Sequence, residues 1–172
     1  MTYIIIALFL SLFIVLIVLV QRMFNQWMQY KERNWAFQLK SDNNKALSTL
    51  RITAYERVII MLERISPTSL VMRQNITGSS AAMLQLELMR SVREEFEHNI
   101  SLQLYVSDDT WEKVRNAKDE VLELIKEAFL KVKPESAAID LSREIFKLEA
   151  STNTRAIKTA LDAIRAELES KY

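Results

Sequence analysis

The sequence of 172 residues contains no cysteine, one glycine, two prolines and one histidine. Without cysteine, the chain has no disulfide, no thiolate nucleophile and no cysteine-based zinc site. Its one glycine, Gly78, cannot form the glycine-rich loops that bind phosphates or dinucleotides, which excludes nucleotide enzymes of those classes. Its one histidine, His98, cannot supply a multi-histidine metal centre. What remains is a helix-rich protein with a formal net charge of +1.

An apolar run, YIIIALFLSLFIVLIVLV, extends from Tyr3 to Val20 without a charged residue. As a helix it covers about 27 Å, close to the roughly 30 Å of a bilayer's hydrocarbon core. A cleaved signal peptide and a buried core helix are the alternatives, but the run lacks both a preceding basic residue and a small-residue cleavage site. We therefore predict a retained transmembrane anchor over residues 1–20. The side chains expected to hold it in the bilayer and at the interface are Tyr3, Ile4, Phe9, Phe13, Val20, Phe24 and Trp27.

Basic residues follow this run closely, at Arg22, Lys31, Arg33 and Lys40. Because positive charge marks the cytoplasmic side of a membrane helix, the N-terminus is expected outside and the rest of the chain in the cytoplasm. Apolar and aromatic residues at three- and four-residue steps over 21–40 predict an amphipathic juxtamembrane stalk.

Residues 41–172 are expected to form a cytoplasmic antiparallel helical bundle, so the predicted fold class is all-α. Polar residues at 41–44 favour a break, after which a stripe from Leu47 to Ile65 predicts a helix that ends before Pro67. A loop with one helical turn is expected over 66–80, and further helices over 80–104, from Ser107 or Asp108 to Pro134, over 137–150 and over 154–171. Short connections favour antiparallel neighbours, and no strand-like alternation of useful length is present.

Two segments, LRITAYERVIIMLERI at 50–65 and REEFEHNISLQLYVSDDTWEKVRNAKDE at 93–120, carry a resemblance. They resemble the central blocks of an uncharacterised family of small, N-terminally anchored, single-pass membrane proteins from Bacteroidota. The resemblance implies a bacterial inner membrane but no activity. It also implies a shared interaction surface at Tyr55, Glu56, Arg57, Glu63, Arg64, Glu95, Glu97, His98, Asn99, Gln103, Tyr105 and Trp111.

The motif that most specifically suggests a metal site is Glu95-Phe96-Glu97-His98. A Glu-x-x-His motif on a helix supplies metal ligands in di-iron bundles. One chain has a single histidine, so only a dimer could complete such a centre. We expect instead a structural polar network of His98 with Glu94 or Glu95, and we predict no metal and no cofactor. The sequence as a whole shows no spacing that would place a nucleophile beside a base, which argues against an enzyme.

Residues 66–133 carry 9 basic and 11 acidic residues and residues 134–172 carry 6 and 7, so nucleic-acid binding is not expected. The predicted function is a non-enzymatic, membrane-anchored adaptor or scaffold of the bacterial inner membrane that acts through helix–helix contacts. Its partners are then the lipid bilayer and a protein that the sequence does not identify, or a second copy of the chain. The alternative is a module that binds a lipid or another apolar ligand at the membrane surface, suggested by Trp27, Trp35, Met61, Met72, Met83 and Met89.

Overall fold

The computed structural model describes residues 2–74, 78–152 and 155–171, with side chains described for 16–28, 31, 45–74, 78–151 and 155–171. Every regular element in these ranges is a helix. The helices are α1 (Thr2–Ile65), α2 (Pro67–Arg73), α3 (Ala81–Asn99), the 3₁₀ helix η1 (Ile100–Leu104), α4 (Asp108–Leu130), α5 (Ala138–Thr152) and α6 (Arg155–Lys171). The only β-type pairing in the described ranges is a bridge between Ser80 and Ala137. The all-α prediction is confirmed for this part of the chain.

α1 corrects the predicted break at residues 41–44, because it continues through this polar cluster to Ile65. Serine, aspartate and asparagine each cost less than about 0.7 kcal/mol relative to alanine in a helix interior, whereas proline costs about 3 kcal/mol. Neither proline nor glycine occurs before Ser66. The first residue strong enough to end the helix is therefore Pro67.

The contacts divide the chain into two units, Met1–Ser48 and Thr49–Tyr172. The second unit begins later than the predicted boundary at residue 41. In the first unit, Val20, Phe24 and Trp27 are exposed, and the Lys31 ammonium lies 4.3 Å from the centre of the Trp27 ring.

The predicted anchor falls mostly outside the side chains that the structure describes. Tyr3, Ile4, Phe9 and Phe13 belong to this undescribed part. Among the residues that are described, no helix combines the length and the apolar character needed to cross a membrane.

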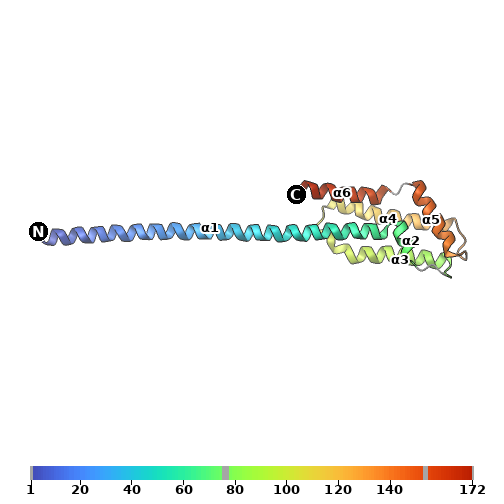
Figure 1. Cartoon of the computed structure of the whole chain (residues 1–172), viewed down its shortest axis with the longest axis horizontal. Coiled ribbons are helices and arrows are strands. Elements are labelled where there is room, and N and C mark those ends of the chain that lie inside the picture. Colours follow the sequence, from blue (N-terminus) through green and yellow to red (C-terminus); the bar gives the residue numbers. More distant parts are fainter. Residues whose placement is uncertain (1, 75–77, 153–154, 172) are drawn as a thin grey trace. The chain divides into compact units, whose positions relative to one another are not determined.

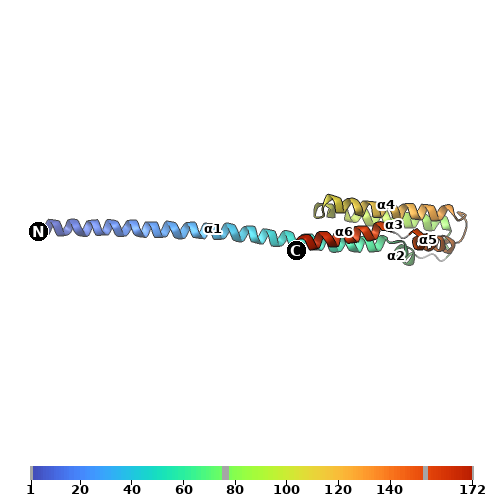
Figure 2. The same cartoon turned by 90° about the horizontal axis from the view of Figure 1, so that it is seen from above.

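The second unit is a helical bundle. Residues 49–65 of α1 run beside α3, α4 and α6, and each of these long helices is antiparallel to the next along the chain (Figures 1 and 2). α4 packs against α3, α5 and α6. α2 and α5 pack against each other at one end of the bundle, where the Thr68 hydroxyl donates to the Glu149 carboxylate at 2.6 Å.

The core consists of one apolar stripe from each helix, as the periodicity predicts. Its largest fully buried members include Met61, Leu62 and Ile65 of α1, Leu88 of α3, Ile125 of α4, Leu141 and Ile145 of α5, and Ile164 of α6. The predicted stripe on α1 is too long by one turn or more, since Leu47 and Leu50 are 50% and 49% exposed and burial begins at Ala54.

The helix ends follow local signals. The Ser80 hydroxyl accepts a hydrogen bond from the Met83 amide at 3.3 Å, and the Ser107 hydroxyl accepts one from the Thr110 amide at the same distance. These are N-caps of α3 and α4. The helix predicted over 80–104 ends at Asn99 and continues only as the tighter η1.

Candidate functional site

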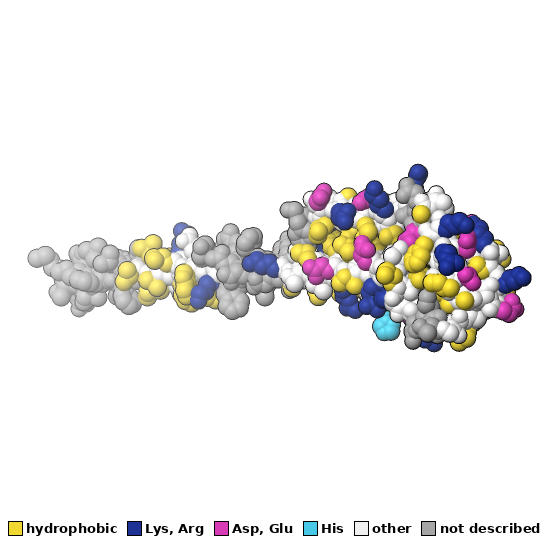
Figure 3. All heavy atoms as spheres, turned by 45° about the vertical axis from the view of Figure 1, so that its right-hand side comes forward, with side chains coloured by type: hydrophobic (Ala, Val, Ile, Leu, Met, Phe, Trp, Pro, Cys, Tyr) yellow, Lys and Arg dark blue, Asp and Glu magenta, His cyan; other side chains and the backbone are white. Residues whose placement is uncertain are grey.

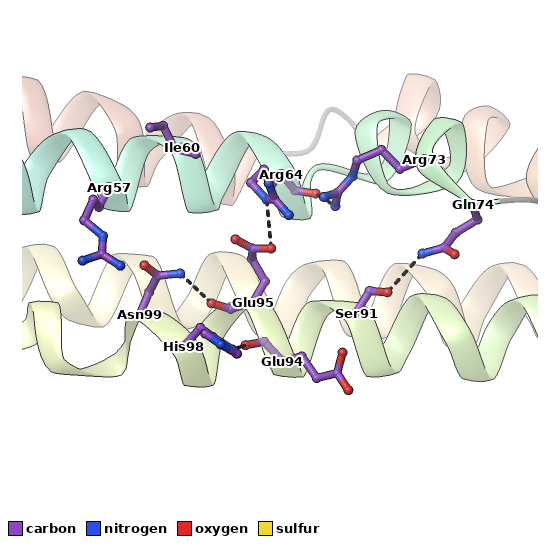
Figure 4. Close-up of a pocket in the computed structure, with 10 residues that line it drawn as sticks. All are labelled: Arg57, Ile60, Arg64, Arg73, Gln74, Ser91, Glu94, Glu95, His98 and Asn99. Atoms are coloured by element: carbon purple, nitrogen blue, oxygen red, sulfur yellow. Dashed lines mark hydrogen bonds and ion pairs between the residues drawn. The ribbon is translucent and has the colours of Figure 1, made fainter.

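An open groove lies between α1 and α3 in the second unit, and we call it the α1–α3 groove (Figure 4). Its volume is about 680 Å³. It is lined by Arg57, Ile60 and Arg64 of α1, Arg73 and Gln74 at the end of α2, and Ser91, Glu94, Glu95, His98 and Asn99 of α3. On each long helix, the lining residues recur at three- and four-residue steps beside the buried stripe. The amphipathic pattern that builds the core therefore also places these polar side chains along its edge.

Hydrogen bonds fix the floor of the groove across the helices. The Arg64 guanidinium contacts the Glu95 carboxylate at 2.9 Å, and the Gln74 amide donates to the Ser91 hydroxyl at 3.0 Å (Figure 4). The Asn99 side-chain amide donates to the backbone carbonyl of Glu95 at 2.8 Å. The first two bonds connect α1 to α3 and the end of α2 to α3, whereas the Asn99 bond lies within α3.

The groove carries unbalanced positive charge. Glu95 is paired with Arg64, and Glu94 lies 3.4 Å from Arg90, which is outside the groove. Arg73 donates to the carbonyls of Ser69 and Arg64 at 3.2 and 2.5 Å, and these carbonyls do not neutralise its charge.

Arg57 adds a second uncompensated charge. No carboxylate among the described side chains forms an ion pair with Arg57 or with Arg73. In Figure 4 the Arg57 side chain extends from α1 toward α3. The groove therefore presents two guanidinium groups that have no carboxylate partner among the described side chains and whose positive charge can attract carboxylates or other anions.

Part of the predicted interaction surface lies in this groove. Arg57, Arg64, Glu95, His98 and Asn99 line it. Glu56, Glu63, Glu97 and Gln103 are exposed and do not line it, and Tyr105 is half-buried.

Tyr55 and Trp111 are in the core instead of on a surface, at 1% and 6% exposure. Trp111 packs against Phe96 with ring centres 5.5 Å apart, and Tyr55 follows Ala54 at the start of the buried stripe of α1. Both rings are large enough that burial against neighbouring helices is favoured once those helices are in place.

The predicted histidine network takes a different form. Nδ1 of His98 lies 3.3 Å from the backbone carbonyl of Glu94, and the Glu95 carboxylate binds Arg64 instead of the imidazole. Within the described ranges, no group of His, Asp and Glu side chains is arranged to hold a metal ion.

Several groove residues are absent from the predicted surface, including Ile60, Arg73, Gln74 and Ser91. The spacing of Arg57, Ile60 and Arg64 along one edge of α1 is a signal that could have identified Ile60. Arg73 and Gln74 follow a separate short helix, and no local pattern indicates that they reach α3.

A second polar cluster, which the sequence analysis did not predict, joins α1, α4 and α6; we call it the Glu167 cluster. The Glu167 carboxylate accepts hydrogen bonds from the Tyr55 hydroxyl at 2.9 Å, the Ser107 amide at 3.1 Å and the Ser107 hydroxyl at 2.7 Å. The Lys171 ammonium also contacts this carboxylate, and it donates to the Tyr55 hydroxyl at 3.1 Å. Glu167 therefore connects the C-terminal helix to α1 and to the N-cap of α4.

The Glu167 side chain is largely buried, at 8% exposure, and the cluster stabilises the negative charge of its carboxylate there. Burial acts to raise the pKa of this carboxyl, but hydrogen bonds from Lys171, Ser107, Thr110 and Tyr55 together outweigh burial and lower the pKa from 4.5 to about 2. Hydrogen bonds to Glu167 and Tyr55 raise the pKa of Lys171, and burial raises the pKa of Tyr55. The carboxylate and the ammonium are both charged at neutral pH.

Among the described residues of the second unit, the methionines that suggested an apolar ligand do not share a site. Met61 is fully buried, whereas Met72 and Met83 are 78% and 64% exposed. Met89 lines a separate hollow on α3. Trp35 lies outside the described side chains.

Residues 1–171 match a protein family described as "Family of unknown function (DUF7935)". The chain belongs to this family. Because the match begins at residue 1, it includes the apolar N-terminal segment as well as the bundle. No curated protein and no solved structure matches the chain.

Proposed function

We propose that this member of the DUF7935 family is a non-enzymatic, membrane-anchored adaptor whose α1–α3 groove binds an acidic segment of a protein partner. The observation that carries the proposal is the pair of guanidinium groups, Arg57 and Arg73, in an open groove without a neutralising carboxylate among the described side chains. Ile60 is 57% exposed in the same groove and offers an apolar contact beside the charges. An acidic segment with one hydrophobic side chain complements this combination.

The proposed anchor is the apolar run of residues 3–20, with the N-terminus outside the bacterial inner membrane and the bundle in the cytoplasm. The charge-free run and the basic residues that follow it support this arrangement. In this position the bundle holds a bound partner at the membrane surface.

The groove is tested by crosslinking in cells with a photoreactive amino acid in place of Ile60. We expect an adduct with one acidic protein segment, identified by mass spectrometry. Because Arg57 forms no ion pair among the described residues, Arg57→Glu should leave the fold intact, and we expect it to reduce the adduct yield about tenfold or more. Arg115→Glu is the matched control, since Arg115 of α4 is exposed and outside the groove, and it should leave the yield unchanged.

A charge exchange completes this test. Replacing the acidic residues of the captured segment with lysine should restore the adduct to the Arg57→Glu chain. The proposal is wrong if Arg57→Glu and Arg115→Glu have the same effect, or if the adduct is a membrane lipid.

The topology is tested with single cysteines, because the chain has no natural cysteine and therefore no labelling background. In bacterial cells with a permeabilised outer membrane, a membrane-impermeant maleimide should label Thr2→Cys directly. Arg115→Cys should react only after the inner membrane is opened. Labelling of Arg115→Cys in closed cells would contradict the proposed orientation, and release of the chain by alkaline carbonate would contradict the anchor.

A further inference from the structure

The uncompensated positive charges of the α1–α3 groove lie toward its two ends. Arg57 lies toward one end, and Arg73 lies toward the other, where its guanidinium donates to the Arg64 carbonyl at 2.5 Å (Figure 4). Between them, the Arg64 guanidinium is neutralised by the Glu95 carboxylate at 2.9 Å. In Figure 3 the histidine, shown in cyan, lies beside a group of Lys and Arg side chains at the surface of this unit. The groove therefore offers two separate positive sites instead of one continuous positive surface.

The distance between these two positive sites follows from α1. Arg57 and Arg64 are seven residues apart, which is about 10.5 Å along the helix axis. Helix carbonyls point along the axis toward the C-terminal end, so the Arg73 guanidinium lies beyond Arg64 by about the length of its 2.5 Å hydrogen bond. The two uncompensated guanidinium groups are therefore roughly 13 Å apart along the groove.

The lining of the groove favours an extended partner segment over a helical one. Of the described residues that line the groove, only Ile60 is apolar. A helix that binds in a groove packs its apolar face against an apolar surface, and a short helix is only marginally stable without such packing. An extended segment instead needs hydrogen-bond partners for its backbone.

Polar side chains of the groove can supply these partners. The side-chain carbonyl of Gln74, the hydroxyl proton of Ser91 and Nε2 of His98 form no hydrogen bond within the described ranges. Ser91 and His98 are seven residues apart on α3, so they span about 10.5 Å of the groove. These groups offer an extended backbone both donors and acceptors along most of the groove.

The side-chain spacing of an extended segment matches the distance between the two positive sites. Residues two apart on a strand point to the same side and lie about 6.7 Å apart. Residues four apart share that side and lie about 13 Å apart, whereas residues seven apart on one face of a helix lie only about 10.5 Å apart. Two carboxylates four positions apart on an extended segment therefore reach Arg57 and Arg73 together.

We infer that the acidic segment binds in an extended conformation and carries two acidic residues four positions apart, with an apolar residue midway between them. One carboxylate binds Arg57, the apolar side chain contacts Ile60, and the other carboxylate binds Arg73. The inference rests on the proposed function and names the kind of segment that the same groove accepts.

Glu95 disfavours an acidic residue in the middle of this segment. Its side chain is 19% exposed, and its carboxylate already pairs with the Arg64 guanidinium. A third carboxylate at that position meets a paired arginine and the negative charge of Glu95, so it loses hydration without gaining an ion pair. The groove should therefore prefer an acidic–apolar–acidic segment over a uniformly acidic one.

The test measures binding of fluorescent synthetic peptides to the detergent-solubilised full-length chain by fluorescence anisotropy. Three peptides share one composition, with one leucine and two glutamates among threonines and glutamines, and both peptide ends are blocked. The glutamates lie two positions before and after the leucine in the first peptide, and directly before and after it in the second. In the third they lie four before and three after it, which is the same-face spacing of a helix. We expect the first peptide to bind about tenfold or more tightly than the other two.

A fourth peptide and two charge exchanges test the order of the contacts. Replacing the leucine of the first peptide with glutamate should weaken binding about threefold or more. Arg57→Glu should weaken binding of the first peptide about tenfold or more, whereas the control Arg115→Glu should not change it. Of the two versions of the first peptide in which a single glutamate becomes lysine, one should regain binding to the Arg57→Glu chain to within about threefold, because only one glutamate faces Arg57.

The outcomes separate this inference from the proposed function. Equal binding of the first three peptides, preference for the third, tighter binding of the fourth, or recovery by both or neither of the lysine peptides would overturn the inference, while the effect of Arg57→Glu still supports the groove. If no peptide binds, or if Arg57→Glu and Arg115→Glu act alike, the proposed function is wrong and the inference falls with it.

Discussion

Replacing Trp111 with alanine is expected to lower the free energy of unfolding of the bundle by about 3 to 5 kcal/mol. Trp111 is 6% exposed, and its ring centre lies 5.5 Å from that of Phe96. The substitution removes the main aromatic contact between α3 and α4 and leaves a cavity that the surrounding helices cannot fully close. Because the bundle comprises residues 49–172, a loss of this size corresponds to a decrease in melting temperature on the order of 10 °C.

This effect is measured by urea unfolding of the detergent-solubilised chain, followed by circular dichroism at 222 nm. Leu130→Ala is the matched control, since Leu130 ends the same helix but is 84% exposed and should change the unfolding free energy by less than about 0.5 kcal/mol. Equal effects of the two substitutions would show that Trp111 is not part of the folded core.

Protonation of Glu167 is expected to remove about 3 kcal/mol of stability as the pH falls from about 5 to 2. The pKa of Glu167 is about 2 in the folded chain, below its ordinary value of 4.5, so the folded state favours the carboxylate. The stabilisation is therefore fully present above pH 4.5 and is lost as the pH falls through the folded-state pKa. The groups that face this carboxylate are Tyr55 of α1, Ser107 and Thr110 of α4, and Lys171 of α6.

Unfolding measured across this pH range separates Glu167 from the other carboxylates. Glu167→Gln keeps the shape of the side chain but not its charge, so we expect a loss of about 2 to 3 kcal/mol at pH 7 and a correspondingly weaker dependence on pH. Glu169→Gln is the control on the same helix, where Glu169 is exposed, and it should retain the original slope. An unchanged slope for Glu167→Gln would contradict a charged Glu167 cluster.

The two polar sites of the bundle have different chemical capacities. In the Glu167 cluster, the carboxylate already accepts hydrogen bonds from donors of three elements, namely Tyr55 of α1, the α4 N-cap Ser107 and Lys171 of α6. The α1–α3 groove retains uncompensated guanidinium groups. The first is therefore suited to stabilising the fold, and the second to binding a partner.

The sequence by itself determined the elements that depend on local chemistry. Pro67 lies two residues after the end of α1, Ser80 and Ser107 are N-caps, and the three- and four-residue spacing of apolar residues identified the core faces of α3, α4 and α6. The helix predicted to reach Pro134 ends earlier, at Leu130. These features are predictable because caps, prolines and periodicity act within a few residues along the chain.

Only the tertiary structure decided the features that depend on which helices become neighbours. The local sequence around Tyr55 and Trp111 does not show whether these side chains lie on a surface or in a core. They are buried because of the helices that pack around them. Glu167 meets Tyr55 across 112 positions of sequence, and Arg64 meets Glu95 across 31. Such contacts arise from the packing of the helices, which the spacing of residues along one helix does not encode.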